Sequence, residues 1–218
     1  MGTEMSFLEF VEGPLFYIAA TIFLTGAAWR VIGILRIGHK PSLAPPKGSS
    51  VKGFFIGNLR YFFPREMFAG RTWMHIFGGY SFHLGLFIVL LFAVPHIAFI
   101  EERVLGFGWT ALPRWAFIVA AQFAFAGLIV LWVRRISDPV MRLISDWDDH
   151  VGSWLTFLVM LTGCLALQES HDGLQALHML FVDIWLIYFP FSRLMHAVTF
   201  VLSRGYTGAE YGRKGVTL

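Results

Sequence analysis

The sequence predicts an all-α integral membrane protein, a five-transmembrane-helix bundle that forms a single membrane domain over residues 1–218. Two compositional observations favour this fold class: 56% of the residues are hydrophobic and only 14% are charged, whereas soluble domains carry about 25% charged residues. A globule of this size buries only about two thirds of its surface, so it could not hide so much apolar surface from water. The lone Cys164 excludes an internal disulfide, and a net charge of +3 is too small to indicate a nucleic-acid partner.

Five stretches are apolar over roughly the 20 residues that a helix needs to cross a bilayer. The first is not typical of a cleaved signal peptide, because the residues before it are acidic where a signal peptide is basic. A long connection at 36–74 separates the first stretch from the second. The five predicted spans are residues 13–35, 77–100, 115–133, 151–167 and 174–202.

Basic residues gather in alternate connections between these spans. All Lys and Arg residues except Arg103 and Arg114 lie in the segments 30–71, 134–142 and 193–214. Because basic loops stay in the cytoplasm, this pattern predicts that the N-terminus is outside and the C-terminus is cytoplasmic. An odd number of spans gives the same result. We therefore expect a multi-pass protein of the cytoplasmic (inner) membrane of a prokaryote.

The long connection changes character along its length. It begins polar and rich in turn-forming residues, and from Gly53 to Pro64 it becomes aromatic and basic. Two interpretations remain open. One is an interfacial segment that rests on anionic headgroups, and the other is a docking surface for a cytoplasmic partner.

Four of the eight histidines lie within the predicted spans. An ionisable group within a membrane is costly and therefore suggests a functional site, although an interhelical hydrogen bond explains any single one. His178 and His196 are 18 residues apart, which on a continuous helix is five turns, one face and about 27 Å of rise. The antiparallel second span would bring His83 level with His196 on the cytoplasmic side, and His96 level with His178 on the outer side.

Two histidine pairs at different depths are typical of bis-histidine b-type haem. A zinc site would need three or four ligands at one point, whereas a porphyrin itself supplies four of the six iron ligands. The step from His83 to His96 misses a common face by about 140° on an ideal helix, but Pro95 can kink the helix and reset its phase. His75 is an alternative ligand, because its step to His96 misses by only about 60°.

The fifth predicted span carries the most specific motif. From His178 a long apolar run leads to Phe-Pro-Phe-Ser-Arg-Leu at 189–194, then one residue, then His196. This pattern resembles the last helix of the gamma subunit of respiratory nitrate reductases. Phe82-His83-Leu-Gly85 is similar to the Phe-His-Ile-Gly of the same family, which bears an inner haem ligand.

The resemblance implies two haems b, with one iron held by His83 and His196 on the cytoplasmic side. The other iron would be held by His178 and a second-span histidine on the outer side. The family places its outer ligand ten residues after the inner one, where this chain has Ala93, so His96 is the natural substitute. This departure indicates a member of the wider superfamily rather than nitrate reductase itself. Such relatives serve iron–sulfur, heterodisulfide-reductase-like or molybdenum enzymes.

The role implied by the resemblance is that of the quinone-reactive electron-transfer subunit of a respiratory oxidoreductase complex. Electrons would pass between membrane quinone or quinol and a cytoplasmic iron–sulfur subunit, and the terminal catalytic site would lie on another subunit. A quinone site needs a polar group that takes a proton or donates a hydrogen bond. Candidates on the outer side, each also explicable as an ordinary loop residue, are His171, Asp172, Glu101, Glu102 and Arg114.

Two other functions remain alternatives. One is a cytochrome b that anchors a periplasmic hydrogenase or formate dehydrogenase, although the basic 36–74 loop and the short outer loops favour a cytoplasmic partner. The other is a haem-free membrane transporter or structural subunit, which would show no visible absorption.

Overall fold

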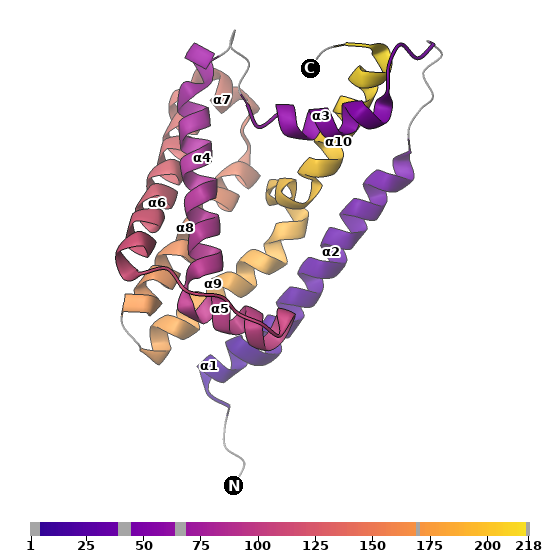
Figure 1. The fold of residues 1–218 in the computed structure, drawn as a ribbon. Helices are drawn as coiled ribbons and strands as arrows, with labels where there is room; N and C mark the ends of the chain where they lie inside the picture. Colours follow the sequence, from indigo (N-terminus) through magenta and orange to yellow (C-terminus); the bar gives the residue numbers. More distant parts are fainter. Residues whose placement is uncertain (1–4, 39–44, 64–68, 169–170, 217–218) are drawn as a thin grey trace. The chain divides into compact units, whose positions relative to one another are not determined.

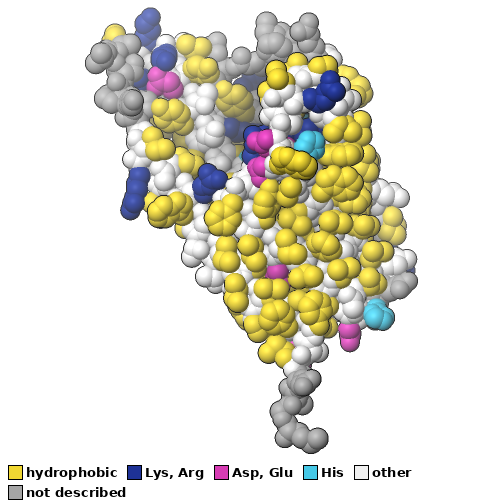
Figure 2. Space-filling model, turned by 180° about the vertical axis from the view of Figure 1, so that it is seen from behind, with side chains coloured by type: hydrophobic (Ala, Val, Ile, Leu, Met, Phe, Trp, Pro, Cys, Tyr) yellow, Lys and Arg dark blue, Asp and Glu magenta, His cyan; other side chains and the backbone are white. Residues whose placement is uncertain are grey.

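The computed structural model describes residues 5–38, 45–63, 69–168 and 171–216, and these residues form helices and connections without a strand (Figure 1). Five helical segments are long and apolar enough to cross a membrane, as the sequence predicts. Figure 2 shows apolar side chains over much of the surface in that view. The five segments are Phe7–Ile37, Thr72–Phe92, Arg114–Ser137, Trp147–Gln168 and Asp172–Phe191.

The chain folds into two compact units, residues 1–65 with 158–218, and residues 66–157. The helix α8 (Trp147–Gln168) contributes its first half to the second unit and its second half to the first.

The first unit begins with a helix that changes its winding. The short α1 (Phe7–Phe10) is capped by Ser6, whose hydroxyl accepts from the Glu9 amide while the Glu9 carboxylate accepts from the Ser6 amide. A π-helical turn, η1 (Val11–Leu15), follows and contains Pro14, which has no N–H to donate. The chain then continues as α2 (Phe16–Ile37), which packs against α9 (Asp172–Tyr188).

The fifth predicted span is not one continuous helix. After α9 ends, two 3₁₀ turns, η4 (Phe189–Phe191) and η5 (Arg193–Met195), flank an extended Ser192, and α10 (His196–Lys214) begins at the histidine. The physical cause is local, because Pro190 removes a backbone donor and the Ser192 hydroxyl caps the next turn. His178 and His196 therefore lie on different helices, and the expectation that they share one helix face is wrong.

The helix α2 packs directly against this break. An added Cβ at Gly26 would lie 2.5 Å from the Cβ of Pro190, so only glycine fits there. The Arg30 guanidinium donates from Nε to the Pro190 carbonyl at 3.1 Å. Phe189 and Met195 are buried with Ala27 in the core of this unit. The residues at the break are thus held in place by contacts with α2.

Two helices that are distant in sequence form a close pair, α3 (Ser50–Arg60) and α10, which we call the α3–α10 pair. Their backbones meet at glycines, because an added Cβ at Gly208 would overlap the Gly53 carbonyl and lie 2.8 Å from the Gly57 Cα. The amides of Lys47 and Gly48 donate to the Arg213 carbonyl near the end of α10, at 2.8 and 3.2 Å. The aromatic, basic part of the predicted loop is therefore a helix.

The second unit is centred on α4 (Ala69–Phe92) and α6 (Arg114–Ser137), which lie side by side (Figure 1). Small residues allow this approach. An added Cβ at Gly85 would lie 2.5 Å from the Ala120 carbonyl oxygen, and one at Gly78 would lie 3.0 Å from the Val130 side chain. Gly79, by contrast, has no described residue within 4 Å of an added Cβ, its own helix backbone aside.

The second predicted span also contains a break. The helix α4 ends at Phe92, Ala93 is extended, and α5 (Val94–Ile100) begins with Pro95 in its first turn. This agrees with the expected effect of Pro95 on the helix. A π-helical turn, η3 (Glu101–Leu105), ends the segment at Gly106, whose φ of 75° favours glycine.

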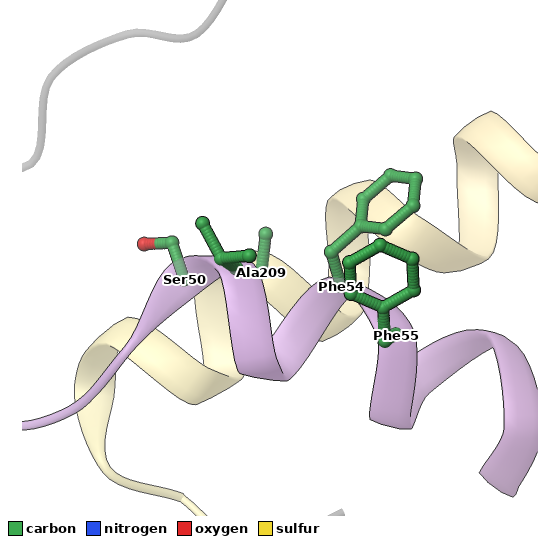
Figure 3. A pocket seen from close by; sticks show the side chains of 5 residues that line it. Ser50, Phe54, Phe55 and Ala209 are labelled. Atoms are coloured by element: carbon green, nitrogen blue, oxygen red, sulfur yellow. The ribbon is translucent and has the colours of Figure 1, made fainter.

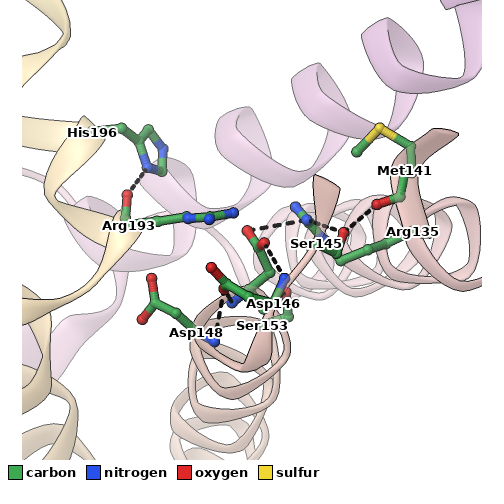
Figure 4. A network of polar contacts seen from close by, with 9 residues as sticks. Arg135, Met141, Ser145, Asp146, Asp148, Ser153, Arg193 and His196 are labelled. Carbon is green, nitrogen blue, oxygen red and sulfur yellow. Dashed lines mark hydrogen bonds and ion pairs between the residues drawn. The ribbon is translucent and has the colours of Figure 1, made fainter. Parts of the chain in front are cut away.

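The basic end of α6 is held by a polar network (Figure 4). The Arg135 guanidinium lies 3.0 Å from an Asp149 carboxylate oxygen and donates to the Ser145 hydroxyl at 2.8 Å. Asp146 accepts from the amides of Asp148 and Asp149, so it caps α8. The short α7 (Pro139–Ile144) is capped by Asp138.

Candidate functional site

The four span histidines share one hydrogen-bond pattern. In three of them Nδ1 meets a backbone carbonyl, and in the fourth it meets a hydroxyl that already donates elsewhere. A carbonyl can only accept, so Nδ1 carries the proton and Nε2 carries the lone pair. Metal-binding histidines usually donate their second ring nitrogen in this way. The contacts are His83 to Gly79 O (2.7 Å), His96 to Leu90 O (2.9 Å), His178 to Thr162 Oγ1 (3.3 Å) and His196 to Arg193 O (2.8 Å).

His178 on α9 lies against α8. The Thr162 hydroxyl donates to the Leu158 carbonyl at 2.8 Å, so its oxygen accepts from Nδ1 of His178. The imidazole packs on the next residue, because an added Cβ at Gly163 would lie 2.9 Å from its Cε1 and 3.2 Å from its Nδ1. One hydrogen bond and one close contact therefore fix the orientation of this ring.

His83 lies in the middle of α4, one turn after the open position Gly79. Its Nδ1 bonds the Gly79 carbonyl, and its ring makes an edge contact with Phe82 at a centroid distance of 4.8 Å. The open position at Gly79 would leave room for a flat macrocycle next to the imidazole. The Gly79–His83 face is therefore compatible with a haem.

His96 donates a hydrogen bond to a carbonyl in the last turn of α4. The last carbonyls of a helix have no partner within that helix, and here the Leu90 carbonyl accepts from His96 Nδ1 at 2.9 Å. The neighbouring Leu91 carbonyl accepts from the Trp109 indole at 2.8 Å, and that of Phe92 accepts from the Leu112 amide at 3.3 Å. His96 thus has a structural role through Nδ1 that is compatible with a ligand role through Nε2.

His196 is the first residue of α10, directly after the break. Its Nδ1 bonds the Arg193 carbonyl within the preceding turn (Figure 4). The side chain is exposed. The Phe-Pro-Phe-Ser-Arg-Leu motif therefore forms the turns that orient this imidazole.

The other predicted site residues, apart from His75, lie at or beside element ends. His171 has the opposite pattern, because its Nδ1 accepts from the Gly173 amide at 3.1 Å and caps α9, which begins at Asp172. His75 is exposed on α4. Glu101 and Glu102 begin η3, and Arg114 begins α6. His171 is thus best explained as a helix cap.

The candidate ligands divide between the units, with His83 and His96 in one and His178 and His196 in the other. Which histidine of one unit would share a haem with which histidine of the other therefore stays a prediction. Within the described ranges, no group of three or more His, Cys, Asp or Glu side chains could hold a metal ion. A haem iron would need only two axial side chains from the protein.

Sequence reasoning missed the neighbours of His178. Thr162 and Gly163 carry no motif that would reveal their contact with a histidine. Asp183 on α9 is completely buried, and neither of its carboxylate oxygens has a hydrogen-bond partner among the described residues. A buried carboxylate without a partner is rare, but its position in an apolar span gives no signal of which helix it faces.

Taken together, the fold and the site define an all-helical membrane protein with four span imidazoles that share one tautomer. No known family model and no solved structure matches the sequence. A protein of Nitratidesulfovibrio vulgaris (strain Hildenborough) is 28% identical over 94% of this chain and 93% of its own length. The Hdr-like menaquinol oxidoreductase cytochrome b-like subunit of Archaeoglobus fulgidus is 23% identical over 83% of this chain and 74% of its own length.

The second of these distant relatives fits a wider cytochrome b superfamily, and neither name refers to nitrate reductase. The five candidate spans themselves indicate a multi-pass membrane protein.

Proposed function

We propose that this chain is the dihaem b-type cytochrome subunit of a respiratory complex in a prokaryotic cytoplasmic membrane. It would pass electrons between membrane quinol and a cytoplasmic iron–sulfur subunit, with the terminal catalytic site on a further subunit. The observation that carries this proposal is the shared tautomer of the four span histidines, each with its lone pair on Nε2. The menaquinol oxidoreductase named for the Archaeoglobus relative supports the same role.

The assignment of ligands follows the predicted depths. His83 and His196 would hold the inner haem iron, and His96 and His178 the outer one, with His75 as an alternative in the second span. Bound haem supplies one-electron chemistry. The chain's own residues orient the axial imidazoles, because the hydrogen bond at each Nδ1 limits rotation of the ring.

The charge pattern supports an orientation with the N-terminus outside. The end of α6 carries Arg134 and Arg135, and α10 ends with Arg213 and Lys214. The cytoplasmic side would therefore be the basic one. Quinol would bind on the opposite side, near the outer haem, where Asp172, Glu101, Glu102 and Arg114 remain candidate contacts.

Single histidine substitutions test the proposal in the purified full-length chain. His83→Ala and His196→Ala should each remove the same haem, and His96→Ala and His178→Ala should each remove the other. Haem content and redox spectra measure the loss. His171→Ala is the matched control and should keep both haems, since His171 uses Nδ1 to cap α9.

Retention of both haems in His196→Ala would contradict the assignment. Loss of a haem in His75→Ala, with both retained in His83→Ala, would show that His75 is the ligand instead.

A further inference from the structure

The helix α3 carries an exposed apolar stripe. Val51, Phe55 and Leu59 recur every four residues, and they are 69%, 63% and 67% exposed. Beyond the helix, Phe63 is 66% exposed, whereas the Phe62 ring packs against Arg204 and Phe200 of α10. Such a row of large apolar side chains on one helix face indicates a surface that meets another apolar phase.

This stripe faces away from the helix that packs on α3. Gly53 and Gly57 contact α10, and the stripe residues are two positions from them, which is about 160–200° around the helix. Figure 3 shows Phe54 and Phe55 on α3 beside Ala209 of α10. They line an open apolar hollow of about 260 Å³ with Ser50 and Val51. The α3–α10 pair therefore leaves the stripe uncovered.

The opposite side of the pair is polar. On α10 the positions two residues from the contact glycines Gly205, Gly208 and Gly212 are Ser203, Tyr206, Thr207, Glu210 and Lys214, all with a polar group. Lys214 lies 2.9 Å from the Glu210 carboxylate, and the Thr207 hydroxyl donates to the Ser203 carbonyl. The pair thus has one apolar outer face, on α3, and one polar outer face, on α10.

The charged side chains in and around α3 are all basic. Lys47, Lys52 and Arg60 lie in or beside α3, and the sequence has no Asp or Glu between Glu12 and Glu66. A short helix with apolar and aromatic residues on one face and basic residues beside them is typical of an interfacial helix on anionic lipid.

The position of α3 in the chain favours lipid over a soluble partner. It connects two membrane-spanning helices, α2 and α4, whose adjoining ends must lie at the same membrane surface. Figure 1 shows α3 lying crosswise to α2, beyond its C-terminal end. Because both ends of α3 are joined to membrane-spanning helices, α3 is held at the headgroup level.

We propose that α3 is a membrane-interface helix whose Val51–Phe55–Leu59 stripe enters the acyl boundary of a leaflet with anionic headgroups. Lys52 and Arg60 bind lipid phosphates beside it. The Gly53 and Gly57 contacts hold α10 on the water side, so the two helices form a layer on the membrane surface. This inference is independent of haem binding.

Site-directed spin labelling of the full-length chain tests this placement. With Cys164 replaced by serine, labels at Phe55→Cys and Leu59→Cys report the stripe, and a label at Ser203→Cys is the matched control on α10. The protein is reconstituted in vesicles of equal parts phosphatidylcholine and phosphatidylglycerol. Collisions with oxygen and with a water-soluble nickel chelate measure the depth of each label.

Labels at 55 and 59 should collide with oxygen and lose collisions with nickel, whereas the label at 203 should show the reverse. In vesicles of phosphatidylcholine alone, nickel collisions at 55 and 59 should rise. If both stripe labels were as accessible to nickel as the control, lipid would not be the occupant and the stripe would be a protein-docking face. Identical accessibility in the two vesicle types would overturn the role of anionic headgroups.

Discussion

The contact between Thr162 and His178 gives the sharpest prediction. The Thr162 oxygen accepts from Nδ1 of His178 at 3.3 Å, and such donation makes an imidazole a stronger electron donor to its metal. Thr162→Val keeps the size of the side chain but removes the acceptor. Because a stronger donor favours ferric iron, loss of this bond should raise the midpoint potential of the outer haem.

The expected size of the shift follows from the energy of one hydrogen bond. A neutral bond contributes about 1 kcal/mol net. If the whole of this free energy stabilises ferric but not ferrous iron, its loss raises the midpoint potential by about 40 mV. The conversion is about 1.4 kcal/mol to 59 mV for one electron. This value is an upper limit for Thr162→Val. Gly163→Ala should act on the same haem, because its Cβ would lie 2.9 Å from the His178 Cε1 and must displace the ring.

Potentiometric titration followed by optical and electron paramagnetic resonance spectra measures the effect. The outer haem is the one that His178→Ala removes. Thr25→Val is the matched control, because the Thr25 hydroxyl donates to the Thr21 carbonyl within α2. If Thr162→Val and Gly163→Ala both left the potentials and resonance positions of the two haems unchanged, our account of the His178 environment would be refuted.

Three further changes test other parts of the structure. Gly79→Leu should lower inner-haem content, whereas Gly33→Leu, at an equally open position, should not. Equal inner-haem content in the two variants would contradict the proposal that the haem lies beside Gly79. Gly208→Ala should destabilise the α3–α10 pair by about 1–3 kcal/mol, because its Cβ overlaps the Gly53 carbonyl, and hydrogen exchange in α3 should speed up. Asp183→Leu should raise the free energy of unfolding by about 1–3 kcal/mol, because it removes a buried carboxyl that has no hydrogen-bond partner in the described part of the chain. A fall in the free energy of unfolding by a similar amount would show that the carboxyl does have a partner.

Much of the fold could be predicted because hydropathy depends only on local composition. The five candidate spans and the effect of Pro95 are both apparent in the structure. The break at Ser192 was harder to predict, since it combines Pro190 with a cap made by the Ser192 hydroxyl and with packing from α2. A long apolar run containing one proline does not distinguish a bend from a complete interruption.

The site was predictable only in its residue types. Histidines in apolar spans are conspicuous, but their hydrogen-bond partners depend on how far each helix is rotated. Thr162 and His178 are on different helices, and no short motif links them. The α3–α10 pair did leave a signal, because Gly53 and Gly57, like Gly208 and Gly212, have the four-residue spacing of close helix contacts.

The central claim is that four imidazoles with the same tautomer hold two haems. The most direct measurement is the haem-to-protein ratio of the purified chain, with a reduced-minus-oxidised spectrum before and after addition of menaquinol. We predict two b haems per chain, both reduced by the quinol. A folded, full-length protein without visible absorption would contradict the claim and would leave a haem-free membrane subunit.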